Sequence, residues 1–341
     1  MQSALSASWQ TNVCCHQDSG RSTTQVAFAL SVCEGSMSAT NLILQLQNAE
    51  SKLTFCPHIG AAIARFTWRG HDILRRTPDT AIKQSLVRQM GVYPLVPYSN
   101  RIGNANLIVG EQTFTLRPNF LPEPHAIHGL GWQRAWQLAK HTSDFAELTL
   151  KHTPDADWPF AFGARQTMHL AANALKLTLE LKNTDQRPMP AGLGFHPFFP
   201  LVPGTHMQSE WKGMWKMGTD SLPTVLGPVP PDADFSQLRP VTDWKVDNCF
   251  TGWSRRVALD YPTHRVEIDA SDACRQIVVF APNDGRNFIA LEPVTNINNA
   301  FALAAKGIPD TGTRLLASGE SLNIAMSITL VGRAATNATS A

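Results

Sequence analysis

The sequence has few charges, no long run of one charge sign and no long hydrophobic segment. Charged residues make up 16% of the 341 residues, and the net charge is +2. Without a basic run, nothing attracts the chain electrostatically to nucleic acid or to an anionic membrane. No segment reaches the roughly 20 apolar residues that a membrane helix requires. We therefore expect neither a nucleic-acid partner nor a membrane partner.

The cysteines lack the spacing of a metal or redox motif, because no two of them form a Cys-x-x-Cys pair. The six are Cys14, Cys15, Cys33, Cys56, Cys249 and Cys274. A disulfide framework is not expected in a chain of this length with such scattered positions. Buried free thiols in a reducing compartment fit this usage, and we expect a cytoplasmic protein.

The N-terminal residues differ in composition from the rest, since residues 1–36 are rich in Ser, Thr and Gln. Their one apolar run, residues 26–30, is preceded only by Arg21 as a positive charge, which makes a poor signal peptide. We expect a disordered extension over residues 1–36, one folded domain over residues 37–333 and a disordered tail over residues 334–341.

From about residue 40 onward, apolar and polar residues alternate with the period of half-buried strands. Residues 175–182 and 322–330 are clear examples. No long stretch has the 3.6-residue apolar period of a helix, and 22 Gly and 23 Pro punctuate the strands. The pattern predicts an all-β fold, built as an antiparallel sandwich or barrel.

Some strand pairings can also be predicted from the turns between strands. The expected pairs are residues 63–68 with 73–74, 136–138 with 148–151, and 266–269 with 277–280. Residues 204–243 contain a proline-rich run at 228–231. We expect this segment to form a long irregular loop at the rim of a cleft.

Four short polar clusters interrupt the strand pattern. They are Asn100-Arg101-Ile102, His125-Ala126-Ile127-His128-Gly129, Gly194-Phe195-His196-Pro197-Phe198-Phe199 and Leu291-Glu292-Pro293-Val294-Thr295. The apolar surroundings of His196, together with a nearby carboxylate, would tune its pKa as an acid. Glu292 follows a predicted strand, where a carboxylate is costly to bury unless it is paired or functional. An acid, a base and a fixed cation in one cleft could open and close a sugar ring.

Each of these side chains also has a structural interpretation. Arg101 could be a surface arginine in a salt bridge, and His196 could be a hydrogen-bonded core histidine. Glu292 could form an ion pair at the end of its strand. Asp247, another acid between apolar residues, carries little information by itself.

The two histidines of the second cluster have a His-x-x-His spacing. Imidazole is a common metal ligand, but the fragment around His125 and His128 offers no third ligand, and the motif is loose. We expect no metal here, and His128 could equally be a structural histidine. The aromatic residues Trp132, Trp136 and Trp253 could stack on a sugar, although buried core positions are commoner for such side chains.

Taken in order, the clusters resemble the aldose 1-epimerase (galactose mutarotase) family over about residues 40–332. The matching fragments are Asn100-Arg101-Ile102-Gly103, His128-Gly129 followed by a tryptophan, residues 194–199, Asp247 with Cys249-Phe250, Leu291-Glu292-Pro293, and Gly319-Glu320-Ser321. The resemblance implies a large antiparallel β-sandwich with an open sugar-binding cleft. It also implies a monomer or homodimer without cofactor or metal.

The resemblance further implies a role for each matched side chain. Glu292 would be the general base that removes the proton of the anomeric hydroxyl, and His196 the general acid that protonates the ring oxygen. The residues expected to bind the sugar are Asn100, Arg101, His128 and Asp247. Two segments depart from the family: residues 277–280 are apolar where many members have a sugar-contacting glutamine, and residues 296–302 lack the usual His or Asp. These departures leave the choice of sugar open.

We therefore predict an isomerase, an aldose 1-epimerase (mutarotase) that interconverts the anomers of a free aldose such as galactose or glucose. The chain could instead be a hexose-6-phosphate 1-epimerase, which would need basic side chains around the phosphate. The candidates for that are Lys212, Lys216, Arg255 and Arg256. It could also be a non-catalytic sugar-binding or sensor protein on the same fold, or a metal-dependent isomerase that uses His125, His128 and Glu292.

Overall fold

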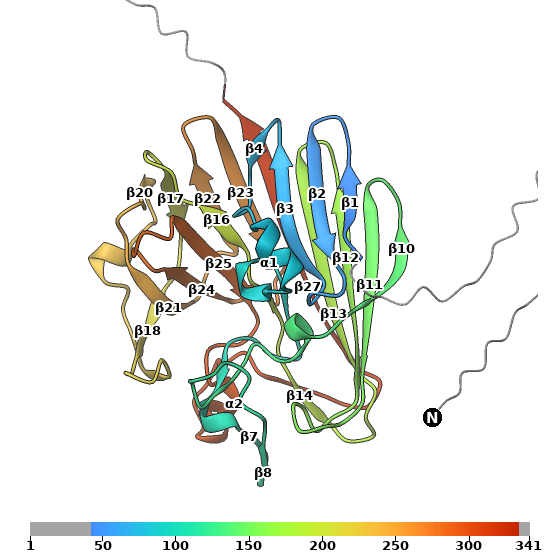
Figure 1. The fold of residues 1–341 in the computed structure, drawn as a ribbon. Coiled ribbons are helices and arrows are strands. Elements are labelled where there is room, and N and C mark those ends of the chain that lie inside the picture. Colours follow the sequence, from blue (N-terminus) through green and yellow to red (C-terminus); the bar gives the residue numbers. More distant parts are fainter. Residues whose placement is uncertain (1–41, 334–341) are drawn as a thin grey trace, which may run out of the picture. The chain divides into compact units, whose positions relative to one another are not determined.

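Antiparallel strands make up most of the regular structure in the computed structural model, which describes residues 42–333 (Figure 1). The predicted extension over residues 1–36 and the predicted tail over residues 334–341 lie outside the described residues. Within residues 42–333, no helix is long and apolar enough to cross a membrane. The expected all-β antiparallel sandwich is confirmed, and its sheets are open rather than closed into a barrel.

One layer of the sandwich is a nine-stranded sheet. In spatial order its strands are β10 (Gln137–His141), β11 (Phe145–His152), β12 (Phe162–Leu170), β13 (Ala174–Asn183), β27 (Ser321–Gly332), β23 (His264–Ala270), β22 (Arg256–Asp260), β17 (His206–Ser209) and β20 (Arg239–Pro240). The predicted strands at residues 175–182 and 322–330 are confirmed as the adjacent strands β13 and β27.

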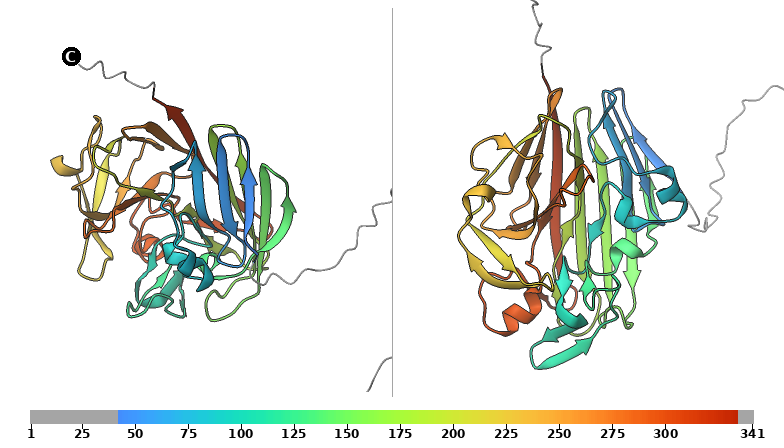
Figure 2. Two further views of the ribbon diagram at one scale, coloured as in Figure 1. Left: turned by 45° about the horizontal axis from the view of Figure 1, so that its top comes forward. Right: turned by 60° about the vertical axis from the view of Figure 1, so that its left-hand side comes forward.

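Two further sheets pack against this layer. The first is β1 (Leu44–Gln47), β2 (Ser51–Cys56), β3 (Ala62–Trp68) and β4 (His71–Asp72). These strands, blue in Figures 1 and 2, lie over the green strands β10–β13. The second is an eight-stranded sheet of β19 (Pro223–Gly227), β18 (Gly213–Met217), β21 (Val246–Thr251), β24 (Gln276–Ala281), β25 (Phe288–Val294), β15 (Gly194–Phe195) and β5 (Pro94–Leu95), with β16 (Phe198–Pro200) also paired to β25.

The remaining elements are short and lie in the connections. They are the strand pairs β14 (Met189–Ala191) with β26 (Arg314–Leu316), β6 (Arg101–Ile102) with β9 (Ala126–Ile127) and β7 (Asn106–Val109) with β8 (Gln112–Thr115), and the helices α1 (Asp79–Lys83) and α2 (Ala300–Ala305). The pair β6 and β9 matters most for function, because it joins the first two polar clusters of the sequence.

The main core forms where the inward faces of all three sheets meet. Leu177 and Leu179 of β13, Phe55 of β2, Ile277 of β24 and Leu291 of β25 are fully buried in one hydrophobic cluster. Each such side chain stabilises the fold by about 1.5–3 kcal/mol through burial. The period-2 alternation of the sequence therefore places these residues in the core, as expected.

The central strands β24 and β25 of the eight-stranded sheet are buried on both faces, and the two faces differ. On β25, Leu291 points into the main core, whereas Ala290 belongs to a second, smaller hydrophobic cluster. On β21, Phe250 and Cys249 divide between the two clusters in the same way. Because alternate residues share a face, Glu292 emerges on the side of the second cluster, as Asp247 does. That face carries the candidate site.

The structure corrects two predictions about pairing. Residues 266–269 and 277–280 are strands, but β23 pairs with β22 and β27 while β24 pairs with β21 and β25, so they belong to different sheets. Residues 204–243 are not one irregular loop, since they contain β17, β18, β19 and β20. The hydrophobic period fixes which residues face a core, but it does not select the partner strand. The predicted hairpins at residues 63–74 and 136–151 are confirmed, although the return strand of the first is His71–Asp72.

Candidate active site

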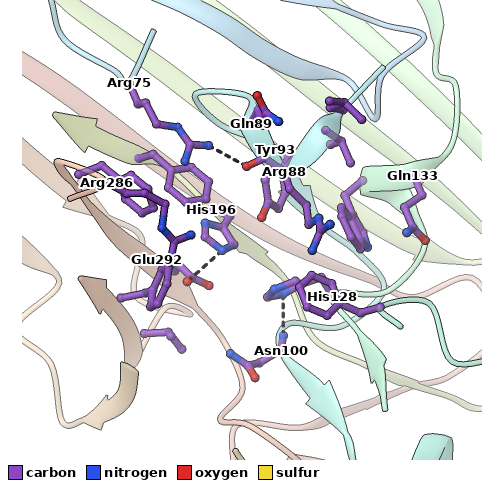
Figure 3. A pocket seen from close by; sticks show the side chains of 18 of the residues that line it. Arg75, Arg88, Gln89, Tyr93, Asn100, His128, Gln133, His196, Arg286 and Glu292 are labelled. Carbon is purple, nitrogen blue, oxygen red and sulfur yellow. Dashed lines mark hydrogen bonds and ion pairs between the residues drawn. The ribbon is translucent and has the colours of Figure 1, made fainter. Parts of the chain in front are cut away.

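A cavity of about 1050 Å³ lies on the face of the eight-stranded sheet that carries Glu292 (Figure 3). All six site residues predicted from the sequence line this cavity. They are Asn100, Arg101, His128, His196, Asp247 and Glu292. The fold thus brings together side chains that are up to 192 positions apart in the sequence.

His196 and Glu292 meet because of a shared strand register. Both β15 and β16 pair with β25, and the two pairings have the same antiparallel register. The link between β15 and β16 contains His196, which therefore lies across from Glu292 on β25. The imidazole Nε2 is 3.2 Å from Glu292 Oε1, which is hydrogen-bonding distance.

This pair is almost completely shielded from solvent, with side chains 8% and 3% exposed for His196 and Glu292. Burial raises the pKa of Glu292 well above 4.5, and the negative charge of Asp247 raises it further. Burial lowers the pKa of His196 well below 6.5, and the positive charge of Arg75 acts in the same direction. Between its two apparent pKa values the pair shares one proton, which can reside on either partner without changing the net charge.

Each partner also keeps an unused polar atom. Among the described residues, His196 Nδ1 and Glu292 Oε2 are buried and have no hydrogen-bond partner. A buried polar atom without a partner costs about 1–3 kcal/mol. The carboxylate therefore retains accepting capacity that a ligand hydroxyl could satisfy.

His128 is held in one orientation by Asn100. The backbone N–H of Asn100 donates to His128 Nδ1 at 3.1 Å, and the backbone N–H of His128 donates to the carbonyl of Asn100 at 2.9 Å. Because Nδ1 accepts, the neutral ring carries its proton on Nε2. Burial, with the charge of Arg101, lowers the pKa of His128 to about 3. The ring is thus a neutral hydrogen-bond donor.

The glycine after His128 is required by the backbone rather than by a ligand. Gly129 has a φ of 68°, and a Cβ atom there would lie 2.1 Å from the carbonyl oxygen of Val96. Asn100 and His128 also have positive φ values, 56° and 61°. These backbone conformations, together with the close approach of Gly129 to Val96, fix the two loops that present Asn100 and His128 to the cavity.

Arg101 lines the cavity and also forms a salt bridge. Its Nε and Nη2 atoms lie 2.7 and 3.0 Å from the two carboxylate oxygens of Glu123. A bidentate pair of this kind orients the guanidinium plane. Arg101 in turn lowers the pKa of Glu123. The sequence contained no signal for Glu123, because its approach to Arg101 depends on the pairing of β9 with β6.

Asp247 reaches the same cavity from β21. Desolvation raises the pKa of Asp247, and the positive charge of Arg101 opposes that shift. Two side chains of the neighbouring strand β24, Val278 and Phe280, line the cavity as well. The apolar stretch noted as a departure from the family therefore faces the site.

Several residues considered in the sequence lie elsewhere. His125 does not line the cavity, because its ring nitrogens contact the backbone of Asn104 and Asp220 at 2.9 and 3.1 Å. Trp136 and Trp253 are buried in the main core, whereas Trp132 lines the cavity. Several other cavity residues to which the sequence did not point are aromatic or basic. They are Tyr93, Phe120, Phe288, Arg75, Arg76, Arg88 and Arg286.

His125 and His128, whose His-x-x-His spacing was considered as a metal motif, do not both reach the cavity, but another possible ligand set does. One nitrogen or oxygen atom from each of His128, His196 and Glu292 lies within 4.8 Å of the others. Two imidazoles and a carboxylate could hold a transition metal. The same three groups can equally act as a hydrogen-bonded acid–base set, and a chelator distinguishes these two uses.

Sequence comparison matches residues 43–329 to the aldose 1-epimerase family. The uncharacterized protein YphB of Escherichia coli K12 is 28% identical over 256 residues, which is 72% of this chain and 86% of YphB. YihR, an uncharacterized protein of the same organism, is 25% identical over 255 residues, which is 71% of this chain and 80% of YihR.

Solved structures agree with this assignment. A protein of E. coli K12 named as a proposed aldose 1-epimerase superposes with a TM-score of 0.78 at 25% identity, covering 86% of this chain and 99% of that one. A galactose mutarotase-like protein of Clostridium acetobutylicum gives a TM-score of 0.74 at 17% identity, covering 85% and 95% of the two chains, and thereby supports the fold. The family match spans most of the chain and includes all six predicted site residues, so this protein belongs to the aldose 1-epimerase family.

Proposed function

We propose that the protein is a mutarotase, which interconverts the α and β anomers of an aldose by opening and closing its ring. The observation that carries this proposal is the buried contact of 3.2 Å between His196 Nε2 and Glu292 Oε1. Ring opening needs one group to take a proton and another to give one, and this pair shares a single proton between two suitable atoms.

In the proposed reaction, Glu292 takes the proton of the anomeric hydroxyl as the bond between C1 and the ring oxygen breaks. His196 gives its proton to that ring oxygen, so the sugar becomes an open aldehyde. The aldehyde rotates about the C1–C2 bond, and the reverse proton transfers close the ring in either configuration. Before opening, the shared proton is on His196, and after opening it is on Glu292. The pair has the same net charge in both states.

The other four residues would bind and polarise the sugar. Neutral His128, with its proton on Nε2, and Arg101, oriented by Glu123, are donors to sugar oxygens. Asn100 and Asp247 would pair with ring hydroxyls. General acid–base catalysis of this kind contributes about 10²–10⁴-fold in rate.

The reaction as proposed uses no metal, and we place it in a reducing compartment such as the cytoplasm. The cysteines within residues 42–333, Cys56, Cys249 and Cys274, are buried free thiols, as expected for that compartment.

Polarimetry on freshly dissolved α-anomers tests the proposal. The sugars would be D-glucose, D-galactose and their acidic derivatives, each followed with enzyme, without enzyme, and with enzyme plus EDTA. We expect accelerated rotation change for at least one sugar and no effect of EDTA. Acceleration that EDTA abolishes would assign His128, His196 and Glu292 to a metal instead. Absence of acceleration for every sugar would overturn the mutarotase proposal.

A further inference from the structure

The cavity that contains the acid–base pair is lined by more positive than negative side chains. Five arginines line it: Arg75, Arg76, Arg88, Arg101 and Arg286. The acidic side chains that line it are Asp247 and Glu292, and burial favours the neutral form of Glu292. A neutral sugar does not require this excess of positive charge.

The arginines differ in whether protein carboxylates neutralise them. Arg101 pairs with Glu123, and Arg286 pairs with Asp284 at 2.7 Å. Within residues 42–333, Arg75, Arg76 and Arg88 have no carboxylate within 4.0 Å. Three uncompensated guanidinium groups thus line one cavity.

Arg75 is the most constrained of the three. Its guanidinium carbon lies 3.7 Å from the ring centre of Phe198 and 4.7 Å from that of Phe288. Its Nη2 donates to the carbonyl oxygens of Arg88 and Met90 at 2.8 and 2.7 Å. Its Nε is buried and has no partner among the described residues. A planar cation fixed against two aromatic rings is a pre-organised site for an anion.

The position of Arg75 relative to the acid indicates which part of a sugar it would meet. Phe198 stacks on His196 with ring centres 4.4 Å apart and an interplanar angle of 19°. Arg75 therefore lies one aromatic ring away from the proposed acid. Figure 3 shows Arg75 and Arg286 on the side of His196 away from His128 and Asn100.

In an aldopyranose, the ring oxygen is bonded to both C1 and C5. C5 also carries the exocyclic carbon. A ring oxygen that faces His196 therefore brings the exocyclic substituent to the side of Arg75. We propose that the substrate is an acidic aldose, with a carboxylate or a phosphate on this exocyclic carbon, bound by Arg75, with Arg76 and Arg88 adding positive charge to the cavity wall. This inference rests on the proposed mutarotase function and narrows its substrate class.

The basic residues suggested by the sequence alone do not serve this purpose. Lys212, Lys216, Arg255 and Arg256 do not line the cavity. The arginines that do line it come from the segment between β4 and β5, from β6 and from the turn before β25.

The test compares neutral and acidic sugars of the same configuration. Mutarotation would be measured for D-glucose, D-glucuronate and D-glucose 6-phosphate, and for the matching galactose series. We expect kcat/KM for the better acidic sugar to exceed that for the neutral sugar at least tenfold, and to fall with added salt because the attraction is electrostatic. Preference for the uronate or for the phosphate identifies the anion.

Two variants connect the preference to the arginines. Arg75→Met keeps a side chain of similar length on Phe198 and removes the charge. Because Arg75 also bonds two backbone carbonyls, Arg88→Gln provides a second variant that leaves the Arg75 side chain in place. Each should lower kcat/KM for the acidic sugar about 10- to 100-fold and that for the neutral sugar much less. Arg314→Gln is the control, since Arg314 is exposed and lies outside the cavity.

The outcomes separate this inference from the function on which it rests. Equal or faster turnover of neutral sugars overturns the acidic-substrate inference and leaves the mutarotase proposal intact. So does a preference for acidic sugars that Arg75→Met and Arg88→Gln both leave unchanged. If neither neutral nor acidic sugars are turned over, the mutarotase proposal itself fails.

Discussion

Glu292 Oε1 lies 3.2 Å from His196 Nε2, and the side chains of both residues are at most 8% exposed. The contact follows from the common register in which β15 and β16 pair with β25. A buried carboxyl and imidazole at this distance share a proton. Their coupling should be seen in the turnover of variants and in the pH dependence of activity and stability.

Replacing Glu292 by Gln should lower kcat about 10²–10⁴-fold, because the amide cannot accept the hydroxyl proton. Sugar binding, measured by calorimetry, should be largely retained, since the amide keeps the size and one acceptor of the carboxyl group. Glu111→Gln, in the exposed turn between β7 and β8, is the control. A Glu292→Gln enzyme with wild-type turnover would exclude Glu292 as the base.

Replacing His196 by Asn should lower kcat to a similar extent, because the side chain can no longer protonate the ring oxygen. The circular dichroism spectrum and the KM should change little. His169→Asn, at an exposed position on β12, is the matched control. Unchanged turnover in His196→Asn would make His196 a structural residue.

The dependence of kcat/KM on pH should be bell-shaped, because only the one-proton form of the pair contains both an acid and a base. On the acid side, kcat/KM falls because the pair takes up a second proton. Since burial lowers the pKa of His196, this fall should lie below pH 6.5. The alkaline limb reports loss of the shared proton, and it should lie well above pH 4.5 because the pKa of Glu292 is raised. A profile without any loss of activity between about pH 4 and pH 10 would contradict the assignment.

Glu123→Gln should raise the KM about tenfold with a smaller effect on kcat, because Arg101 loses the carboxylate that orients its guanidinium group. Glu123 does not line the cavity, so it acts through Arg101 as a positioning residue. Glu123→Asp should recover part of the affinity, which a purely structural role would not predict. A KM unchanged in Glu123→Gln would show that Arg101 is held by other contacts.

Glu292→Gln should also change how stability depends on pH. The raised pKa of Glu292 means that its stabilising contribution is fully present below pH 4.5 and is lost as the pH rises toward the folded-state value. The variant should therefore gain stability relative to wild type by up to about 1.4 kcal/mol per pH unit above 4.5. Urea unfolding at pH 4 to 8 measures this difference, and a difference that is constant with pH would contradict the burial argument.

The period-2 pattern was sufficient to predict the strands and their buried faces. The leucines of residues 175–181 and the apolar residues of 322–330 lie in the core as predicted. The partner of a strand was harder to predict, because apolar alternation fits any sheet with a buried face. Residues 266–269 and 277–280 were assigned to one hairpin for this reason, and they lie in different sheets.

For the candidate site too, the sequence determined one part and the tertiary structure decided another. Asn100, His128, His196 and Glu292 stand in short clusters whose composition is unusual for a strand protein, and the sequence by itself determined that they were candidates. Only the tertiary structure decided that His196 faces Glu292, because that depends on two strand pairings far apart in the chain. It also decided that Glu123 holds Arg101 and that Arg75 joins the cavity. An arginine in a loop has no local pattern that separates a solvated side chain from one stacked on Phe198, because its aromatic partners are over a hundred positions away.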